Sequence, residues 1–218
     1  MTKEIPFYFD YISHNAYLAW TQLPRLAQEH NVTFQPVPIL FGAVLKHNNT
    51  LGPAEVPPKI HWMTKDVMRK SKLLNVPLNP PATHPFNPLL SLRATCAVAD
   101  PAEQSKLIDA MWKAVWVDSQ DVTSTDVVAE VASSVGLDGR HLIEQTQNPD
   151  VKKILINNTQ QAIERGVFGV PSMIVGEELF WGFDDFPHFE LALQGEDPFD
   201  PAEFAAWENV KPSVHRKP

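Results

Sequence analysis

One serine stands where a predicted strand gives way to a predicted helix, a position suited to binding an anion. Residues 11–16 read Tyr-Ile-Ser-His-Asn-Ala, with the serine at position 13. The first N–H groups of a helix lack partners, and the helix dipole adds partial positive charge. A helix end contributes about 0.3–2 kcal/mol and one hydrogen bond from Ser13 about 1.5–3 kcal/mol, so a bound thiol could have its pKa lowered by about one to three units. Most serines at such a position only cap the helix.

A proline before a predicted strand marks a second candidate segment. Gly166-Val-Phe-Gly-Val-Pro-Ser172 follows a predicted helix and leads into the strand 172–175. If the Val170–Pro171 bond is cis, the N–H and C=O of Val170 are free to pair with a peptide-like ligand as a short added strand. A cis bond occurs in only about 5–6% of X-Pro pairs. Together with the serine turn, we nevertheless expect this bond to be cis.

Two further segments carry groups that suit the ends of a small peptide. Phe183-Asp184-Asp185 precedes the last predicted helix, where one aspartate would cap the helix and the other carboxylate could hold an α-amine. Asn49 and Lys59 follow the second predicted strand, and the lysine could pair with a ligand carboxylate. A solvated surface lysine is the simpler interpretation of Lys59.

The predicted elements form a β-α-β unit, a helical block and a β-β-α unit. The β-α-β unit covers 5–10, 16–29 and 32–38. The helical block covers 57–74, 87–99, 101–117, 123–135, a short helix near 140, and 149–165. The β-β-α unit covers 172–175, 179–181 and 187–193. Several helices begin at a proline, whose missing N–H does no harm in a first turn. This order predicts an α/β protein with a thioredoxin-like fold and an all-helical domain inserted in its middle. We expect residues 1–56 and 166–195 in the first domain, 57–165 in the second, and a tail, 196–218, packed over the surface.

The cysteine content limits the chemistry of such a fold. A thioredoxin-like protein carries a Cys-x-x-Cys pair at the start of its first helix, where this chain has Ser13 and Ala16. The single cysteine, Cys96, cannot form an internal disulfide and is expected to be a small buried hydrophobe. The sulfur would then belong to a ligand, for which glutathione is the candidate.

Composition excludes several classes of partner. The formal charge is −8, from 18 Lys and Arg against 26 Asp and Glu, which disfavours nonspecific binding to nucleic acid or an anionic membrane. The histidines have no metal-ligand spacing, and no apolar run approaches the roughly 18 residues of a membrane span. The first residues lack the pattern of a signal peptide. We therefore expect a cytoplasmic protein with no metal, nucleic-acid or membrane partner.

The segments that could carry chemistry resemble a known family. Residues 7–19, 166–171 and 179–184 resemble signatures of the kappa-class glutathione transferases and 2-hydroxychromene-2-carboxylate isomerases, and residues 84–89 (His-Pro-Phe-Asn-Pro-Leu) resemble the bacterial isomerase branch. The resemblance covers about residues 4–195. It implies a thioredoxin-like fold with an inserted helical domain, commonly in a homodimer, with glutathione bound between the two parts.

The resemblance also implies roles for the glutathione-binding residues. Ser13 matches the serine that hydrogen-bonds the glutathione sulfur, and Val170 before Pro171 would pair with the cysteinyl backbone. Asp184, beside Phe183, matches the acidic residue on the γ-glutamyl amine. Asn49 and Lys59 match residues near the glycine carboxylate.

The substrate pocket is defined less closely. His14, Asn15 and Trp62 could line a pocket for an aromatic or conjugated carbonyl substrate, and Trp62 could form an apolar wall together with Met63, Trp112 and Trp116. At helical spacing, however, such aromatic residues more often belong to a core.

The reaction that the resemblance implies is a cis-trans isomerisation. Glutathione thiolate would add to a conjugated carbon, the bond would rotate, and the thiolate would leave. The family usually reads Ser-Pro-Tyr-Ser at the serine turn and Asp-Arg near the last helix, where this chain has Ser-His-Asn-Ala and Asp-Asp. The alternatives are therefore a kappa-like transferase that keeps glutathione on its product, a glutathione- or peptide-binding protein without turnover, and a structural protein with no ligand.

Overall fold

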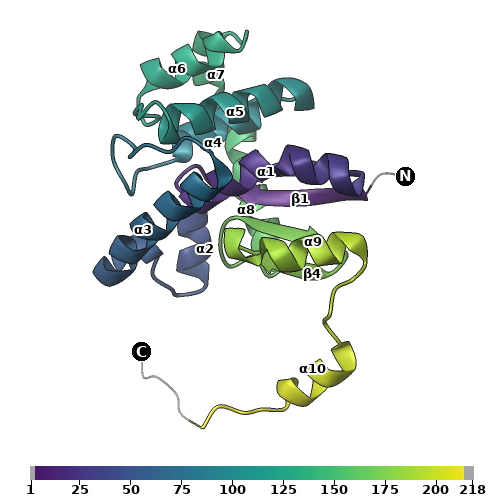
Figure 1. Ribbon diagram of the computed structural model, residues 1–218. Coiled ribbons are helices and arrows are strands. Elements are labelled where there is room, and N and C mark those ends of the chain that lie inside the picture. Colours follow the sequence, from purple (N-terminus) through teal and green to yellow (C-terminus); the bar gives the residue numbers. More distant parts are fainter. Residues whose placement is uncertain (1–2, 214–218) are drawn as a thin grey trace.

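A four-stranded mixed sheet forms the centre of the computed structural model, which describes residues 3–213 (Figure 1). The strands are β1 (Lys3–Phe9), β2 (Val32–Pro38), β3 (Ser172–Val175) and β4 (Glu178–Trp181). They lie in the order β2-β1-β3-β4, with β1 parallel to β2 and antiparallel to β3, and with β3 and β4 forming an antiparallel hairpin. The predicted β-α-β and β-β-α units therefore share one sheet.

Helices cover the sheet, and several of those between β2 and β3 form a block above it (Figure 1). Their bounds are α1 (His14–His30), α2 (Phe41–His47), α3 (Pro57–Leu74), α4 (Leu89–Ala97), α5 (Pro101–Trp116), α6 (Thr125–Ser134), α7 (Gly139–Gln145), α8 (Pro149–Glu164), α9 (Phe186–Gln194) and α10 (Pro201–Glu208), with short 3₁₀ turns at Pro53–Glu55 and Phe183–Asp185. No helix within residues 3–213 is long and apolar enough to cross a membrane.

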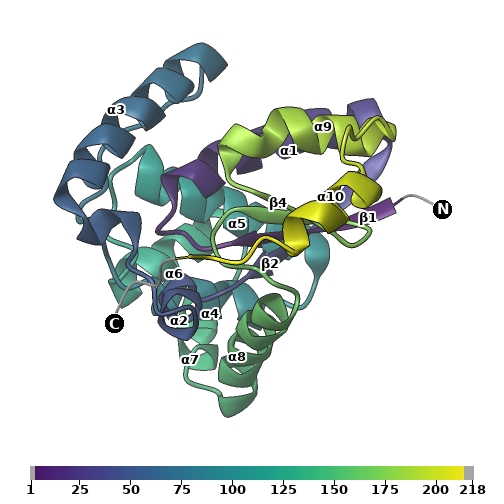
Figure 2. The same ribbon diagram turned by 90° about the horizontal axis from the view of Figure 1, so that it is seen from below.

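Alternation along β1 explains why the sheet is covered on both faces. Ile5, Phe7 and Phe9 are fully buried in the larger core, which also contains residues of α1 and α9. Tyr8 points to the other face and belongs to a smaller core with residues of α8. Successive side chains of a strand point to opposite faces, so each face of β1 requires its own helical cover. Figure 2 shows α1 and α9 on one side of the strands and α8 and α2 on the other.

The inserted helices are joined to the sheet domain through the residues before α1. The Tyr11 hydroxyl and the Thr95 hydroxyl of α4 lie 2.7 Å apart in a buried hydrogen bond. The indole N–H of Trp116, at the end of α5, donates to the Tyr11 carbonyl at 3.1 Å. The larger core continues across this junction, because it contains residues of β1, α1, α4, α5 and α6. The position of the serine turn therefore depends on both parts of the chain.

The order of the predicted elements is correct, but two helices, α2 and α10, were not predicted. The seven residues of α2 lie in a segment for which no helix was expected. No side chain caps this helix at its N-terminus; instead, the buried Asp10 carboxylate accepts the Phe41 N–H at 3.0 Å, and the Thr159 hydroxyl accepts the Leu40 N–H at 3.0 Å. Long-range contacts therefore fix α2.

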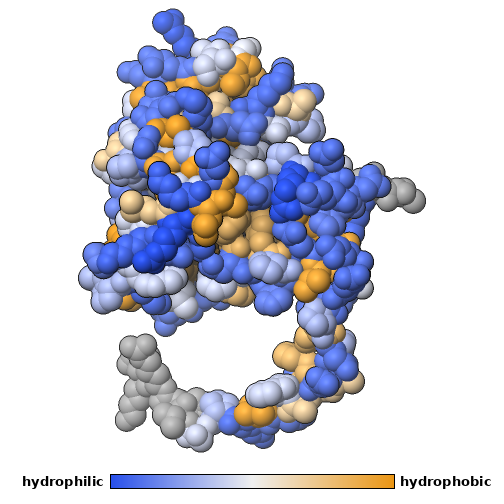
Figure 3. All heavy atoms as spheres, viewed as in Figure 1, coloured by the Kyte–Doolittle hydropathy of each residue, from blue (hydrophilic) through white to orange (hydrophobic). Residues whose placement is uncertain are grey.

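The prediction that the C-terminal tail packs over the surface is wrong. Its described residues, 196–213, include α10, which has no buried residue, and they extend away from the rest of the molecule (Figures 1 and 3). The α10 segment has its own cap, because the Asp200 carboxylate accepts the Ala202 N–H at 2.8 Å. Its large side chains remain exposed, since Trp207 is 72% exposed and Phe204, which contacts Phe199 of the same tail, is 47% exposed.

Candidate functional site

Ser13 joins the start of α1 to the loop before β3. It has extended backbone angles and is the N-cap of α1, and its Oγ accepts the Ala16 N–H at 3.1 Å. The same hydroxyl donates to the carbonyl oxygen of Val170 at 3.3 Å. The helix therefore begins at His14, two residues earlier than predicted. The structure brings together two of the predicted site residues that are 157 positions apart in the sequence.

The corner between these two segments retains unused hydrogen-bond donors. The backbone N–H groups of His14, Asn15 and Val170 donate to no acceptor within residues 3–213. The first two belong to the opening turn of α1, where the helix dipole also favours negative charge. An anionic atom placed here would meet the His14 and Asn15 N–H groups and the Ser13 hydroxyl from the first segment, and the Val170 N–H from the second.

The loop at Pro171 is held tightly against β4. The Val170–Pro171 bond is cis, as expected from the two segments together. The Pro171 carbonyl accepts the Gly182 N–H at 2.9 Å, and the Ser172 hydroxyl donates to the Gly169 carbonyl at 2.8 Å. A Cβ atom added to Gly169 would lie 2.1 Å from Nε1 of Trp181, so only glycine allows this close approach.

The two neighbouring aspartates have different surroundings. The Asp185 carboxylate accepts the Trp181 N–H at 3.1 Å and contacts Nδ1 of His188 at 2.8 Å, which makes it part of the local scaffold. The Asp184 side chain is 72% exposed and pairs with the Lys70 ammonium of α3 at 2.7 Å. Asp184 is therefore the aspartate left accessible to a ligand.

Lys70 places Asp184 in a small charged cluster beside Phe183. Its ammonium also pairs with Asp66 at 2.6 Å, and it lies 6.0 Å from the centroid of the Phe183 ring. A cavity of about 590 Å³ borders this cluster, with Lys70, Phe183 and Asp184 in its wall. A ligand ammonium that reached Asp184 would have to share this carboxylate with Lys70.

The residues expected near a ligand carboxylate lie on an exposed segment. Asn49 has a positive φ of 51° in the loop after α2, and Lys59 is in the first turn of α3. Both side chains are exposed, and no hydrogen bond or ion pair within the described residues joins either of them to Ser13 or Val170. The structure thus leaves both side chains accessible without joining them to the corner.

The predicted apolar wall does not exist as one surface. Trp112 and Trp116 are almost fully buried in the core, whereas Trp62, on α3, is 60% exposed. Their helical spacing reflects packing in the case of Trp112 and Trp116. Trp62 remains a residue of the exposed α3 surface.

His14 turns into the protein beside the serine. Its ring lies 5.8 Å from the Trp116 ring and 6.3 Å from the His84 ring, and its Nδ1 is buried without a partner, as is Oδ1 of Asn15. Burial, with smaller contributions from His84 and Lys70, lowers the pKa of His14 to about 4. At neutral pH this side chain is uncharged and adds no positive charge to the corner.

A buried carboxyl group beneath the turn escaped the sequence analysis. Asp10 is fully buried and accepts the N–H groups of Ile12 at 3.1 Å and of Phe41 at 3.0 Å. Burial raises its pKa to about 7, although the two backbone hydrogen bonds act in the opposite direction. The available signal was an aspartate directly after an aromatic strand. Asp10 connects the serine turn to α2.

The protein's own thiol cannot take part at this corner. Cys96 lies in α4 and is buried, as predicted. Burial raises the pKa of its thiol to about 12, so it stays protonated at neutral pH. A thiolate at Ser13 would therefore have to come from a bound molecule.

One group of side chains has the spacing of a metal site. Glu29, His30 and Glu190 each offer a ligand atom, and these atoms lie within 4.8 Å of one another. Both carboxylates, however, already pair with the Arg25 guanidinium, at 2.5 Å and 2.7 Å. The arrangement is that of a surface ion-pair network.

The chain is similar to known proteins over most of its length. Residues 4–194 match the family model described as a DSBA-like thioredoxin domain. The 2-hydroxychromene-2-carboxylate isomerase of Sphingobium xenophagum is 32% identical over 195 residues, which cover 88% of this chain and 99% of that protein. Glutathione S-transferase kappa 1 of Caenorhabditis elegans is 28% identical over 209 residues, covering 89% and 92%. A solved structure of a 2-hydroxychromene-2-carboxylate isomerase matches with a TM-score of 0.82 at 25% identity, covering 95% of this chain and 100% of that one.

Proposed function

Because the chain belongs to the DsbA-like thioredoxin domain family, we propose that it is a glutathione-dependent isomerase of 2-hydroxychromene-2-carboxylate or of a related conjugated aromatic pyruvate. The observation that carries the proposal is the corner itself. Ser13 Oγ lies at the first turn of α1 and 3.3 Å from the Val170 carbonyl, in a chain whose only thiol is buried elsewhere. The relatives named as isomerases and kappa transferases support this function class.

The groups at the corner fit the cysteinyl part of glutathione. The free N–H groups of His14 and Asn15 can stabilise a thiolate, and the Ser13 hydroxyl can donate to it after turning away from Val170. The Val170 N–H and C=O can then pair with the ligand backbone. Because His14 is neutral at pH 7, the helix end and the hydroxyl supply the stabilisation.

Charged residues on either side would hold the two ends of the tripeptide. Asp184 is assigned to the γ-glutamyl amine, beside Phe183, and Lys70 limits how tightly the amine binds because it already occupies the same carboxylate. Lys59 is assigned to the glycine carboxylate, with Asn49 nearby in sequence. The side chains of Lys59 and Asn49 are both exposed, so each contact would contribute modestly to the affinity for glutathione.

Glutathione, when bound, would supply a thiolate that adds reversibly to a conjugated carbon and so turns a double bond into a rotatable single bond. Ser13 and the start of α1 would hold the sulfur as an anion and receive it again when it leaves. Exposed residues of α3, including Trp62, and the loop at Asn15 would contact the substrate. The runner-up is a kappa-like transferase, in which the sulfur stays on the product.

The test measures glutathione binding and turnover in parallel. Calorimetric titration of the protein with glutathione should give one site per chain. The measured binding heat should depend on the ionisation enthalpy of the buffer, because the buffer takes up the proton that the thiol loses. Ser13→Ala should retain binding but raise the pKa of the bound thiol by about one to two units, which corresponds to a lost charge-assisted hydrogen bond of about 1.5–3 kcal/mol. An unchanged thiol pKa would contradict the role of Ser13.

Peripheral variants separate binding from chemistry. Lys59→Ala and Asp184→Asn should weaken glutathione binding, with little change in kcat at saturating glutathione. Lys153→Ala, in the distant helix α8, is the matched control, since Lys153 is exposed and carries the same charge as Lys59. Equal affinity in Lys59→Ala and in Lys153→Ala would remove Lys59 from the site.

Product analysis decides between the enzyme classes. Release of unmodified glutathione with an isomerised substrate supports the isomerase, whereas a stable conjugate with an electrophilic halonitroarene supports the transferase. Glutathione that raises the melting temperature without either reaction would identify a binding protein. The absence of any thermal shift or heat would refute a glutathione site.

A further inference from the structure

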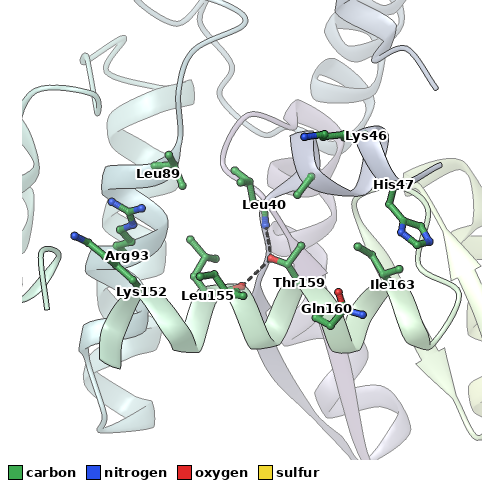
Figure 4. A pocket seen from close by; sticks show the side chains of 12 residues that line it. Leu40, Lys46, His47, Leu89, Arg93, Lys152, Leu155, Thr159, Gln160 and Ile163 are labelled. Carbon is green, nitrogen blue, oxygen red and sulfur yellow. Dashed lines mark hydrogen bonds between the residues drawn. The ribbon is translucent and has the colours of Figure 1, made fainter. Parts of the chain in front are cut away.

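A second cavity lies between helices α2, α4 and α8, away from the residues assigned to glutathione (Figure 4). Its volume is about 610 Å³, and none of its lining residues belongs to the serine corner or to the Asp184 cluster. Each of the three helices contributes a cationic side chain. These are Lys46 of α2, Arg93 of α4 and Lys152 of α8.

The cations of this cavity lack acidic partners. Its lining contains no aspartate or glutamate, and none of the three cations forms an ion pair within residues 3–213. Lys152 contacts only a neutral amide oxygen, that of Gln147, at 3.2 Å. In a chain with a net charge of −8, three unpaired cations around one cavity favour an anionic ligand.

Arg93 gives the strongest sign of a missing partner. Its Nε is buried and has no hydrogen-bond acceptor, although its side chain lines the cavity. Buried polar groups in folded proteins are normally paired. A carboxylate of a bound molecule would supply an acceptor for a guanidinium group, with the geometry that such pairs prefer.

The rest of the wall is apolar. Leu40, Leu155 and Ile163 contribute aliphatic side chains between the charged groups. Figure 4 shows Arg93 and Lys152 at one end of the cavity and aliphatic side chains along its length. The hydroxyl of Thr159 is already used, since it donates to the Leu155 carbonyl and accepts the Leu40 N–H.

We propose that this cavity binds an amphipathic carboxylate, with the carboxylate at Arg93 and Lys152 and an apolar body against Leu155 and Ile163. The lining of this cavity is like that of most small-molecule sites, which are mainly apolar with a few polar groups that fix the orientation of the ligand. The site is separate from the proposed glutathione site and does not depend on it.

The test uses 8-anilinonaphthalene-1-sulfonate as a fluorescent probe, followed by displacement with hexanoate, octanoate and decanoate. One probe should bind per chain, and decanoate should displace it. Affinity should rise by about fourfold for each methylene that is buried, and it should fall with added salt. Inorganic phosphate and glutathione should not displace the probe, because neither offers an apolar body.

Variants locate the site and test its independence. Arg93→Gln and Lys152→Gln should each weaken decanoate binding by about tenfold or more. The control Lys153→Gln removes a neighbouring lysine that is 72% exposed and should change nothing. Ser13→Ala should also leave decanoate affinity unchanged, so failure of the glutathione proposal would be distinguishable.

Four results would overturn the proposal. They are an absence of probe binding, as when a second copy of the chain covers the cavity; displacement that does not depend on chain length; displacement by inorganic phosphate alone; and equal affinity in the parent and in Lys152→Gln. Lys152 is partly exposed, so this variant keeps the test decisive even if Arg93→Gln disturbs folding.

Discussion

Placing a thiol directly on α1 tests the electrostatics of the serine corner without any ligand. In Ser13→Cys, the new sulfur would stand at the N-cap, within reach of the free N–H groups of His14 and Asn15. The substitution exchanges one oxygen for one sulfur in a partly exposed position. It therefore tests the setting of the thiolate more directly than removal of the hydroxyl does.

The expected shift follows from the structure. A free thiol has a pKa of about 8.5, and a helix end with charge-assisted hydrogen bonds would lower it by about one to two units. His14 adds nothing, because its own pKa is lowered to about 4 by burial. If the thiol pKa is about 7, about a quarter of the thiol is ionised at pH 6.5, compared with about one per cent for a pKa of 8.5.

The assay is the rate of alkylation by iodoacetamide between pH 4 and 10. The parent protein is the first control, because its only thiol, Cys96, is buried and has a pKa raised to about 12, so it should not react. Ser134→Cys is the second control, since Ser134 is exposed at the C-terminal end of α6, where the dipole has the opposite sign. That thiol should titrate at or above about 8.5.

The decisive comparison is between the pKa of a thiol at the N-terminal end of α1 and that of a thiol at the C-terminal end of α6. If the thiol at position 13 titrates at the same pH as the thiol at position 134, the corner does not stabilise an anion. The proposed activation of glutathione would then lose its physical basis, whatever glutathione's affinity proved to be.

Two further predictions concern stability. Burial raises the pKa of Asp10 to about 7 in the folded protein. Between about pH 4 and pH 7, the folded state therefore holds a proton that the unfolded state has lost. Raising the pH from 5 to 7 should lower the unfolding free energy of the parent by about 2 kcal/mol more than that of Asp10→Asn. Parallel urea-unfolding curves across this range would contradict the raised pKa. Gly139→Ala should destabilise the protein by about 1–3 kcal/mol, because the new Cβ would lie 2.1 Å from the Ala129 carbonyl oxygen. Gly42→Ala, which meets no atom within 4 Å in α2, should instead be neutral or stabilising by up to about 1 kcal/mol, and similar losses in both variants would refute the steric argument.

Most of the fold could be predicted from residues that are close together in the sequence. Prolines at 57, 101 and 149 are at the first turn of α3, α5 and α8, where the missing N–H has no cost. The sequence also predicted the aromatic strand, the serine turn and the proline before β3, because each of these depends on the chemistry of neighbouring residues. The meeting of Ser13 and Val170 could be anticipated only from the order of the elements.

The features that the sequence did not reveal depend on long-range contacts. The short helix α2 has no side-chain cap and is held by Asp10 and Thr159, which are distant in sequence. Asp10 itself is buried and accepts the first N–H of α2, a contact that its sequence neighbours do not reveal. Trp62 and Trp116 both lie in predicted helices, yet one is exposed and the other is in the core, because helical periodicity does not say which face meets a neighbour.

The bonds from Tyr11 to Thr95 and Trp116 have a consequence for how this protein can unfold and diversify. The helical insertion and the sheet share the larger apolar core, so we expect them to melt together in one cooperative transition. An insertion of this kind cannot be removed or exchanged as an independent module. Changes along α4 and α5, far from Ser13 in the sequence, would still alter the alignment of the serine turn.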